Sequence, residues 1–130
     1  MIEITFPGHS AVDATMKGRV IHTDQAEIAP FDLFLASIAT CAGYYALRFC
    51  QQRDIDTSDL GVTVTPVRSE KRLETVHIAL RLPAALPEKY REAIVRAVDQ
   101  CAVKKAILDP PKFEIDVLRP DIAVAGHPAT

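Results

Sequence analysis

Alternating apolar and polar residues divide the start of the chain into three short segments. These are IEITF (residues 2–6), AVDATM (11–16) and RVIHT (19–23). A period of two is typical of strands with one covered face, and Gly8 and Gly18 lie in the intervening turns. The pattern therefore predicts three strands in a meander.

The segment 31–53 is apolar on nearly every side, and Pro30 suits the first turn of a helix. All-round apolarity is typical of a helix buried at the centre of a fold. One small sheet can hardly cover such a helix. We therefore expect a dimer in which two copies help to bury each other's central helices.

Two alternating runs, 61–70 and 73–83, predict a hairpin, with Pro66 at an edge or a bulge. Residues 86–108 then predict one second helix with a single apolar stripe. The stripe consists of Tyr90, Ile94, Val98 and Cys101. The DPP sequence ends this helix, residues 112–118 predict a last strand, and the tail after Pro120 is expected to be loose.

The order of these elements is β-β-β, long α, β-β, α, β. Clustered strands with two helices predict an α+β fold with a mostly antiparallel sheet on a long central helix. No repeat or linker divides the chain. We expect a single domain over residues 1–130.

Composition narrows the range of partners. The chain is 48% hydrophobic and 25% charged with a net charge of -2, which is ordinary for a globular protein and gives no electrostatic case for nucleic acid. The N-terminus lacks a signal-peptide pattern, and the longest uncharged apolar segment, 33–47, is shorter than a membrane span. We expect a cytoplasmic protein with neither a membrane nor a nucleic-acid partner.

The chain has three cysteines and no C-x-x-C pair, which argues against a disulfide framework or a structural zinc site. Its four histidines are dispersed without ligand spacing, so no metal and no cofactor is expected. Cys41 and Cys50 are nine positions apart, and at about 100° per residue they point to opposite helix faces. These two thiols cannot bond to each other.

Periodicity alone favours plain packing for both Cys50 and Cys41. Cys101 differs, because Lys104 and Lys105 follow at the spacings that share a helix face. A nearby ammonium favours the nucleophilic thiolate. The alternative, that the two lysines form a solvated face near a helix C-terminus, has equal weight.

Two long blocks of the chain resemble a known family. APFDLFLASIATCAGYYALRFCQQRDI and LPEKYREAIVRAVDQCAVKKAILDPPKFEIDV are similar to the OsmC/Ohr superfamily, the osmotically inducible protein C and organic hydroperoxide resistance proteins. The match is closest to a branch with PFDLFLAS-ATCAG and CAVKK blocks. The resemblance extends from about Ile4 to Val117.

This resemblance implies an intertwined α+β homodimer with active sites at the subunit interface. In the family's peroxidases the central-helix cysteine attacks the peroxide and becomes a sulfenic acid, which a second cysteine converts to a disulfide. A dithiol reductant then reopens the disulfide. By this resemblance Cys41 is the peroxidatic and Cys101 the resolving cysteine, while Cys50 matches no catalytic position.

The chain also departs from the family pattern. The early loop FPGHSAV lacks the usual arginine, and Phe31 stands where the peroxidases carry a glutamate. Asp32 is the candidate substitute for that glutamate. Candidates for the missing positive charge are Lys104, Lys105 and His9. The arginine-dependent mechanism is therefore not supported by the sequence.

The leading hypothesis is a thiol-dependent redox protein that reduces organic hydroperoxides or a related small electrophile. Whether it is an enzyme stays open at this point. The main alternative is a non-catalytic dimeric module that binds a small apolar ligand at the subunit interface. A third interpretation is a redox sensor that signals through a partner.

Overall fold

The structure is a computed structural model that describes residues 1–119 and 123–129. Its N-terminal part is a three-stranded antiparallel sheet, as predicted. The strands are β1 (Glu3–Gly8), β2 (Ala11–Met16) and β3 (Arg19–Thr23), in the order β1-β2-β3. Lys17 and Gly18 join β2 to β3 with φ angles of 49° and 73°, the backbone geometry that a two-residue hairpin requires.

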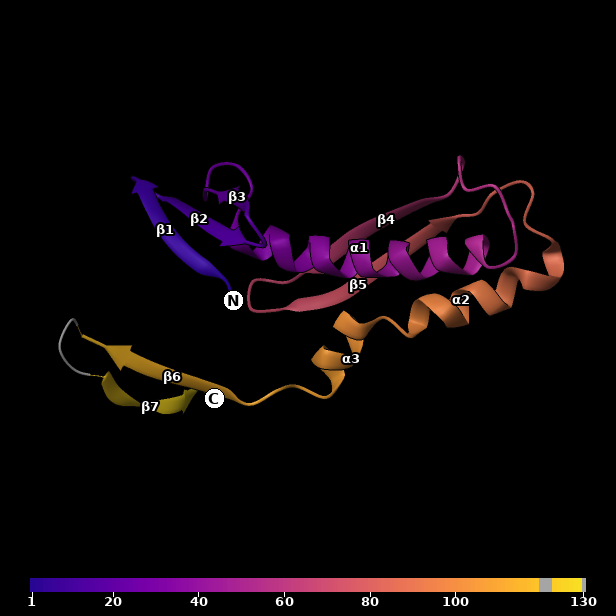
Figure 1. Ribbon diagram of the computed structural model, residues 1–130. Helices are drawn as coiled ribbons and strands as arrows, with labels where there is room; N and C mark the ends of the chain where they lie inside the picture. Colours follow the sequence, from indigo (N-terminus) through magenta and orange to yellow (C-terminus); the bar gives the residue numbers. More distant parts are fainter. Residues whose placement is uncertain (120–122, 130) are drawn as a thin grey trace.

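The long helix α1 (Pro30–Gln51) is the central element of the chain. Pro30 is its first residue, where the missing N–H of proline costs no helical hydrogen bond. α1 packs against β4 (Gly61–Arg68), α2 (Arg91–Asp99) and α3 (Ala102–Leu108), which lie along it in Figure 1. The hairpin covers one side of α1 and the later helices cover another.

The predicted hairpin is present, with β4 paired to β5 (Leu73–Arg81). Pro66 is tolerated because β4 is an edge strand of a two-stranded sheet, and the register shifts next to it, between Val67 and Arg68. Val62, Val64, Val76 and Leu80 are partly buried. The hairpin thus turns an apolar face toward the helices.

The prediction of one continuous second helix was wrong. A 3-10 turn (Glu88–Tyr90) leads into α2, and the helix then breaks at Gln100 and Cys101 before α3 begins. Cys101 has φ -49° and ψ 125°, an extended conformation, and its carbonyl accepts the N–H of Lys105 at 3.0 Å. No glycine or proline causes the break. Tertiary packing of the buried Cys101 against α1 accounts for it.

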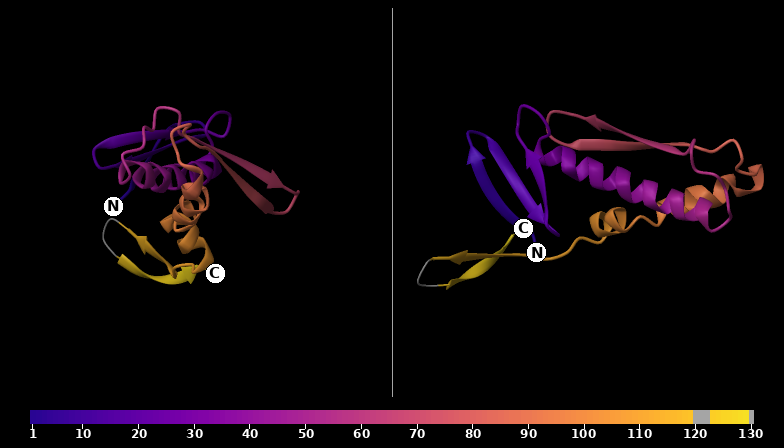
Figure 2. Two further views of the ribbon diagram at one scale, coloured as in Figure 1. Left: turned by 90° about the vertical axis from the view of Figure 1, so that its right-hand side faces the viewer. Right: turned by 45° about the horizontal axis from the view of Figure 1, so that its top comes forward.

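The expectation of a loose tail was also wrong. Residues Ala123–Ala129 form β7, which pairs antiparallel with β6 (Phe113–Leu118). The β6–β7 hairpin stands away from the helices in the right-hand view of Figure 2. The three small antiparallel sheets together with the helices make an α+β fold, as predicted.

The core lies between α1 and α2. It consists of Ala42, Ala46, Phe49, Cys50, Ile94 and Val98. The α1 members recur at helical spacing, so they form one stripe, whereas Thr40, Tyr44 and Arg48 lie exposed on another. The central helix is therefore covered on fewer sides by its own chain than its apolar sequence predicts.

By length and composition alone, α1 is the one helix among the described residues that could cross a membrane. α1 has 22 residues. It is longer than the uncharged segment 33–47, because charged residues such as Asp32 and Arg48 also belong to the helix. Core helices of globular proteins pass the same test, and α1 packs against β4, α2 and α3. The rest of the described chain buries 28% of the 18-residue apolar window of α1.

Candidate active site

Cys41 and Cys101 come together across the interface between α1 and the break in the second helix. Cys41 lies in the middle of α1 and is half-buried, while Cys101 is buried with 3% exposure. Their side chains are hydrogen-bonded neighbours, and both are free thiols. The structure thus brings together the two thiols that the family resemblance pairs.

The break before α3 determines which groups surround the Cys41 sulfur. Because Cys101 is the N-cap residue of α3, the first N–H groups of that helix have no helical partner and point toward the thiols. The N–H groups of Ala102 and Val103 donate to the Cys41 sulfur. A continuous helix would have used these donors within its own ladder.

The pKa of Cys41 lies below its ordinary value. Burial is the largest single influence and raises this pKa, but three hydrogen bonds together outweigh it. The donors are the Cys101 thiol and the N–H groups of Val103 and Ala102. Donors to a sulfur stabilise its charged form, so Cys41 is the thiol of the pair that ionises first.

The pKa of Cys101 is raised. Burial is again the largest cause, and the hydrogen bond and the negative charge of Cys41 add to it. The N–H groups of Lys104 and Val103 lower the pKa of Cys101, but by less than burial and Cys41 raise it. The two shifts have opposite directions, so the pKa of Cys41 lies below that of Cys101 and Cys41 loses its proton first.

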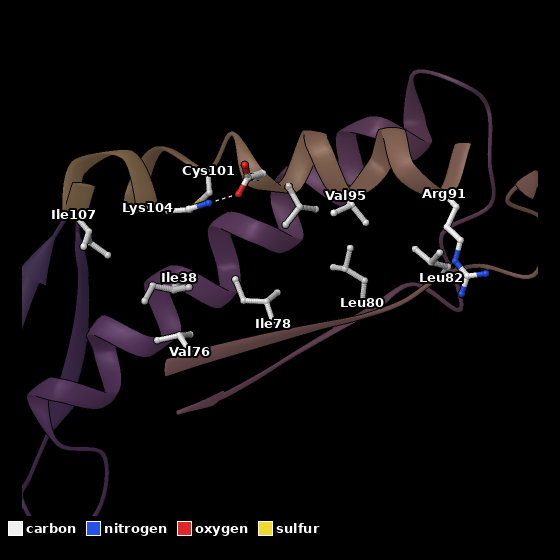
Figure 3. A pocket seen from close by; sticks show the side chains of 12 residues that line it. Ile38, Val76, Ile78, Leu80, Leu82, Arg91, Val95, Cys101, Lys104 and Ile107 are labelled. Atoms are coloured by element: carbon white, nitrogen blue, oxygen red, sulfur yellow. Dashed lines mark hydrogen bonds and ion pairs between the residues drawn. The ribbon is translucent and has the colours of Figure 1, made fainter. Parts of the chain in front are cut away.

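An apolar cavity of about 570 Å³ opens beside Cys101. Figure 3 shows it between α2, α3, α1 and the hairpin, with Cys101 and Lys104 toward one end and Arg91 and Leu82 toward the other. Most of its wall is aliphatic, and the polar residues that line it are Arg91, Asp99 and Lys104. Such a cavity suits a small, largely apolar molecule.

Comparison with protein families agrees with this architecture. The model of the OsmC-like protein family matches residues 22–116, a span that contains α1, the β4–β5 hairpin, both cysteines and most of β6. The chain belongs to the OsmC-like protein family.

Solved structures share the fold of this OsmC-like chain. One is a protein of Psychrobacter arcticus 273-4, provisionally described as an osmotic stress induced and detoxification response protein, with a TM-score of 0.71, 22% identity and coverage of 93% of this chain and 89% of that one. Another is an OsmC-like hydroperoxide resistance protein from Jannaschia sp. CCS1, with a TM-score of 0.55, 16% identity and coverage of 88% and 87%. No curated protein sequence matches the chain.

Of the positive charges proposed from the sequence of this OsmC-like chain, Lys104 lies nearest to the cysteines. It lines the cavity with Cys101, and its ammonium pairs with the Asp99 carboxylate across the helix break. Lys105 is exposed and does not line the cavity. Cys101 caps α3 rather than lying within it, and of the two lysines Lys104 is the one that lines the cavity with it.

Asp32 and His9 have other roles in this structure. The Asp32 carboxylate accepts the N–H of Ala29 at 2.8 Å and so caps the start of α1. His9 lies in the exposed β1–β2 turn with a φ of 52°. Neither residue lines the cavity or donates to either thiol.

Several site features escaped the sequence reasoning. Asp99 and Arg91 were not among the predicted site residues, and the segment with Val76, Ile78 and Leu80 was predicted only as a strand of a hairpin. The alternation of apolar and other residues along β5 is the sequence signal from which this wall could have been predicted. No group of three or more His, Cys, Asp or Glu side chains that could hold a metal occurs within residues 1–119 and 123–129.

Proposed function

We propose that this chain is a thiol peroxidase that reduces organic hydroperoxides with Cys41 as its nucleophile. The observation that supports it most directly is the set of three hydrogen-bond donors around the Cys41 sulfur. The thiolate is the reactive form of cysteine, and these donors favour it at neutral pH. The arrangement supplies stabilisation from helix N–H groups where the family's peroxidases use an arginine.

In the first step the Cys41 thiolate attacks the terminal oxygen of the hydroperoxide. An S–O bond forms while the O–O bond breaks, and the alkoxide leaves and takes a proton from water to become the alcohol. Cys41 is oxidised to a sulfenic acid and the peroxide is reduced.

In the second step the Cys101 sulfur attacks the Cys41 sulfenic acid. A disulfide forms, and the sulfenic hydroxyl leaves with the Cys101 proton as water. The negative charge of Cys41, which raises the pKa of Cys101, is absent once Cys41 is a neutral sulfenic acid. Oxidation of the first thiol therefore activates the second.

A dithiol reductant completes the cycle. It supplies two electrons and two protons to the Cys41–Cys101 disulfide and leaves as its own disulfide. The reducing cytoplasm, where we expect the protein to act, contains such dithiols. The aliphatic cavity beside Cys101 favours a substrate with an apolar organic group over hydrogen peroxide.

The working form that we propose is a homodimer. In the single chain, alternate residues of two outer strands expose large apolar side chains. They are Ile4 and Phe6 in β1 and Phe113, Ile115 and Val117 in β6. Rows of exposed large apolar side chains of this kind are typical of an interface. Phe6→Asp should give a monomer by light scattering, while Thr5→Asp in the same strand should leave the dimer intact.

The decisive experiment is the intact mass after one equivalent of an organic hydroperoxide. The wild-type chain should lose two hydrogens, and the loss should disappear in Cys41→Ser. Cys101→Ser should instead gain one oxygen, as a trapped sulfenic acid on Cys41. Cys50→Ser is the matched control and should behave as the wild type. If Cys41→Ser consumes peroxide as fast as the wild type, the proposal fails.

A non-catalytic module for a small apolar ligand is the second candidate. The aliphatic cavity favours it, since the cavity can hold such a ligand without any thiol chemistry. Native mass spectrometry of the freshly purified protein separates the two functions. A retained ligand together with slow thiol oxidation would support the module, and rapid stoichiometric oxidation would exclude it.

A further inference from the structure

A second depression lies between the C-terminal half of α1 and α2. It encloses about 670 Å³ and lies against the opposite side of the C-terminal part of α2 from the cysteine cavity. Its wall contains three arginines, two tyrosines and two glutamines but no acidic residue. The residues are Tyr44, Tyr45, Arg48, Phe49, Gln52, Arg53, Ala93, Arg96, Ala97 and Gln100. We name it the arginine cleft.

The three arginines have no acidic partner among the residues that the structure describes. Arg48, Arg53 and Arg96 take part in none of the ion pairs among the described residues, although the whole chain has a net charge of -2. The cysteine cavity differs, because Arg91 pairs with Glu88 and Lys104 pairs with Asp99. Unbalanced positive charge is therefore a property of the arginine cleft and not of both depressions.

Two of these guanidinium groups are held in place. Arg48 donates to the Tyr44 hydroxyl at 2.9 Å, and Arg53 donates to the Phe49 carbonyl at 3.1 Å. The Arg53 guanidinium also stacks 3.7 Å from the centre of the Phe49 ring. These contacts use one donor of each group and leave the others free, so less side-chain entropy is lost when a ligand binds.

We infer that the arginine cleft binds a small molecule with two or more linked phosphate groups. Guanidinium forks match phosphate oxygens in pairs, and linked phosphates place several charges within reach of three arginines. The concave volume is in the range that holds a small ligand. A nucleic acid is disfavoured because three arginines on an acidic chain form no extended basic track.

The test is calorimetric titration of the native oligomer with inorganic tripolyphosphate at low ionic strength. We expect saturable binding at one site per chain, about tenfold tighter than orthophosphate because more charge-assisted hydrogen bonds form. Citrate, with carboxylates in place of phosphates, should bind more weakly. Citrate binding as tight as that of tripolyphosphate would overturn the phosphate assignment.

Two arginine variants test whether tripolyphosphate binds in the arginine cleft. Arg96 makes no hydrogen bond, ion pair or ring contact with the described residues, so Arg96→Gln should leave the melting temperature unchanged and weaken tripolyphosphate binding about tenfold. Arg19→Gln removes the same charge from the exposed strand β3 and is the matched control, with unchanged binding expected. Equal weakening by both variants, or no saturable binding to the wild type, would overturn the inference. Peroxidase activity plays no part in the readout, so this result is independent of the proposed function.

Discussion

Cys41 and Cys50 belong to the same helix, but different parts of the chain surround them. Cys50 is fully buried in the core between α1 and α2, and burial raises its pKa even though the nearby charge of Arg53 acts against this. Cys41 is half-buried and accepts hydrogen bonds from Cys101 and from the start of α3, so its pKa is lowered. Donors from other elements, rather than position in a helix, distinguish a thiol whose pKa is lowered from one whose pKa is raised.

The largest expected difference between the two cysteines is in the rate of hydroperoxide consumption. Cys41→Ser should reduce the rate of hydroperoxide consumption by on the order of a thousandfold or more, since removal of a nucleophile leaves only background reaction. Cys50→Ser should change this rate by less than about twofold, because Cys50 is buried in the core between α1 and α2 and has no part in the proposed reaction. Steady-state peroxide consumption with a dithiol reductant measures both. A large activity loss in Cys50→Ser with intact folding would contradict the comparison.

For stability we expect the opposite order, with replacement of Cys50 costing more than replacement of Cys41. Cys50→Ala leaves a small void among Ala46, Ile94 and Val98 and should lower the free energy of unfolding by about 1–2 kcal/mol. Cys41→Ala, at a half-buried site, should cost less. Urea denaturation of both variants provides the measurement, and equal losses would show that the two sites are packed alike.

The dependence of stability on pH should have opposite signs at the two thiols. The folded pKa of Cys50 is raised, so its contribution is complete below the unfolded thiol pKa and is lost as pH rises through the folded value. The folded pKa of Cys41 is lowered, so its contribution appears as pH rises above the folded value. Relative to the wild type, Cys50→Ala should lose stability less steeply with rising pH. Cys41→Ala should show the reverse, and identical slopes in urea titrations would refute the assignment.

The smallest effect concerns the ion pair beside the pair of thiols. Lys104 and Asp99 have side chains that are 42% and 60% exposed. Their pairing should therefore stabilise the fold by less than about 1 kcal/mol. Asp99→Asn should leave the urea midpoint nearly unchanged, and Glu92→Gln, at an exposed acid on the same helix, is the control. If Asp99→Asn unfolds the chain readily, the pair is a structural requirement of the helix break.

The strands were predictable because each alternates along the sequence and ends in its own turn. β2 and β3 match the predicted bounds, and Pro30 lies in the first turn of α1 as predicted. In this structure the Asp32 carboxylate caps α1, and its supporting role beside the thiols stays a prediction. The β6–β7 pairing was missed because the last segment has few strand formers.

The sequence by itself determined the order of the elements from β1 to β5, the α+β class and the identity of the two candidate cysteines. Local periodicity and family blocks suffice for these, since they depend on neighbours in the chain. Tertiary structure alone decided that the second helix breaks at Cys101 and that the freed N–H groups of α3 reach Cys41. The physical reason is that no breaker residue marks this site. The break becomes favourable only when Cys101 is buried against α1, a contact between positions far apart in the chain.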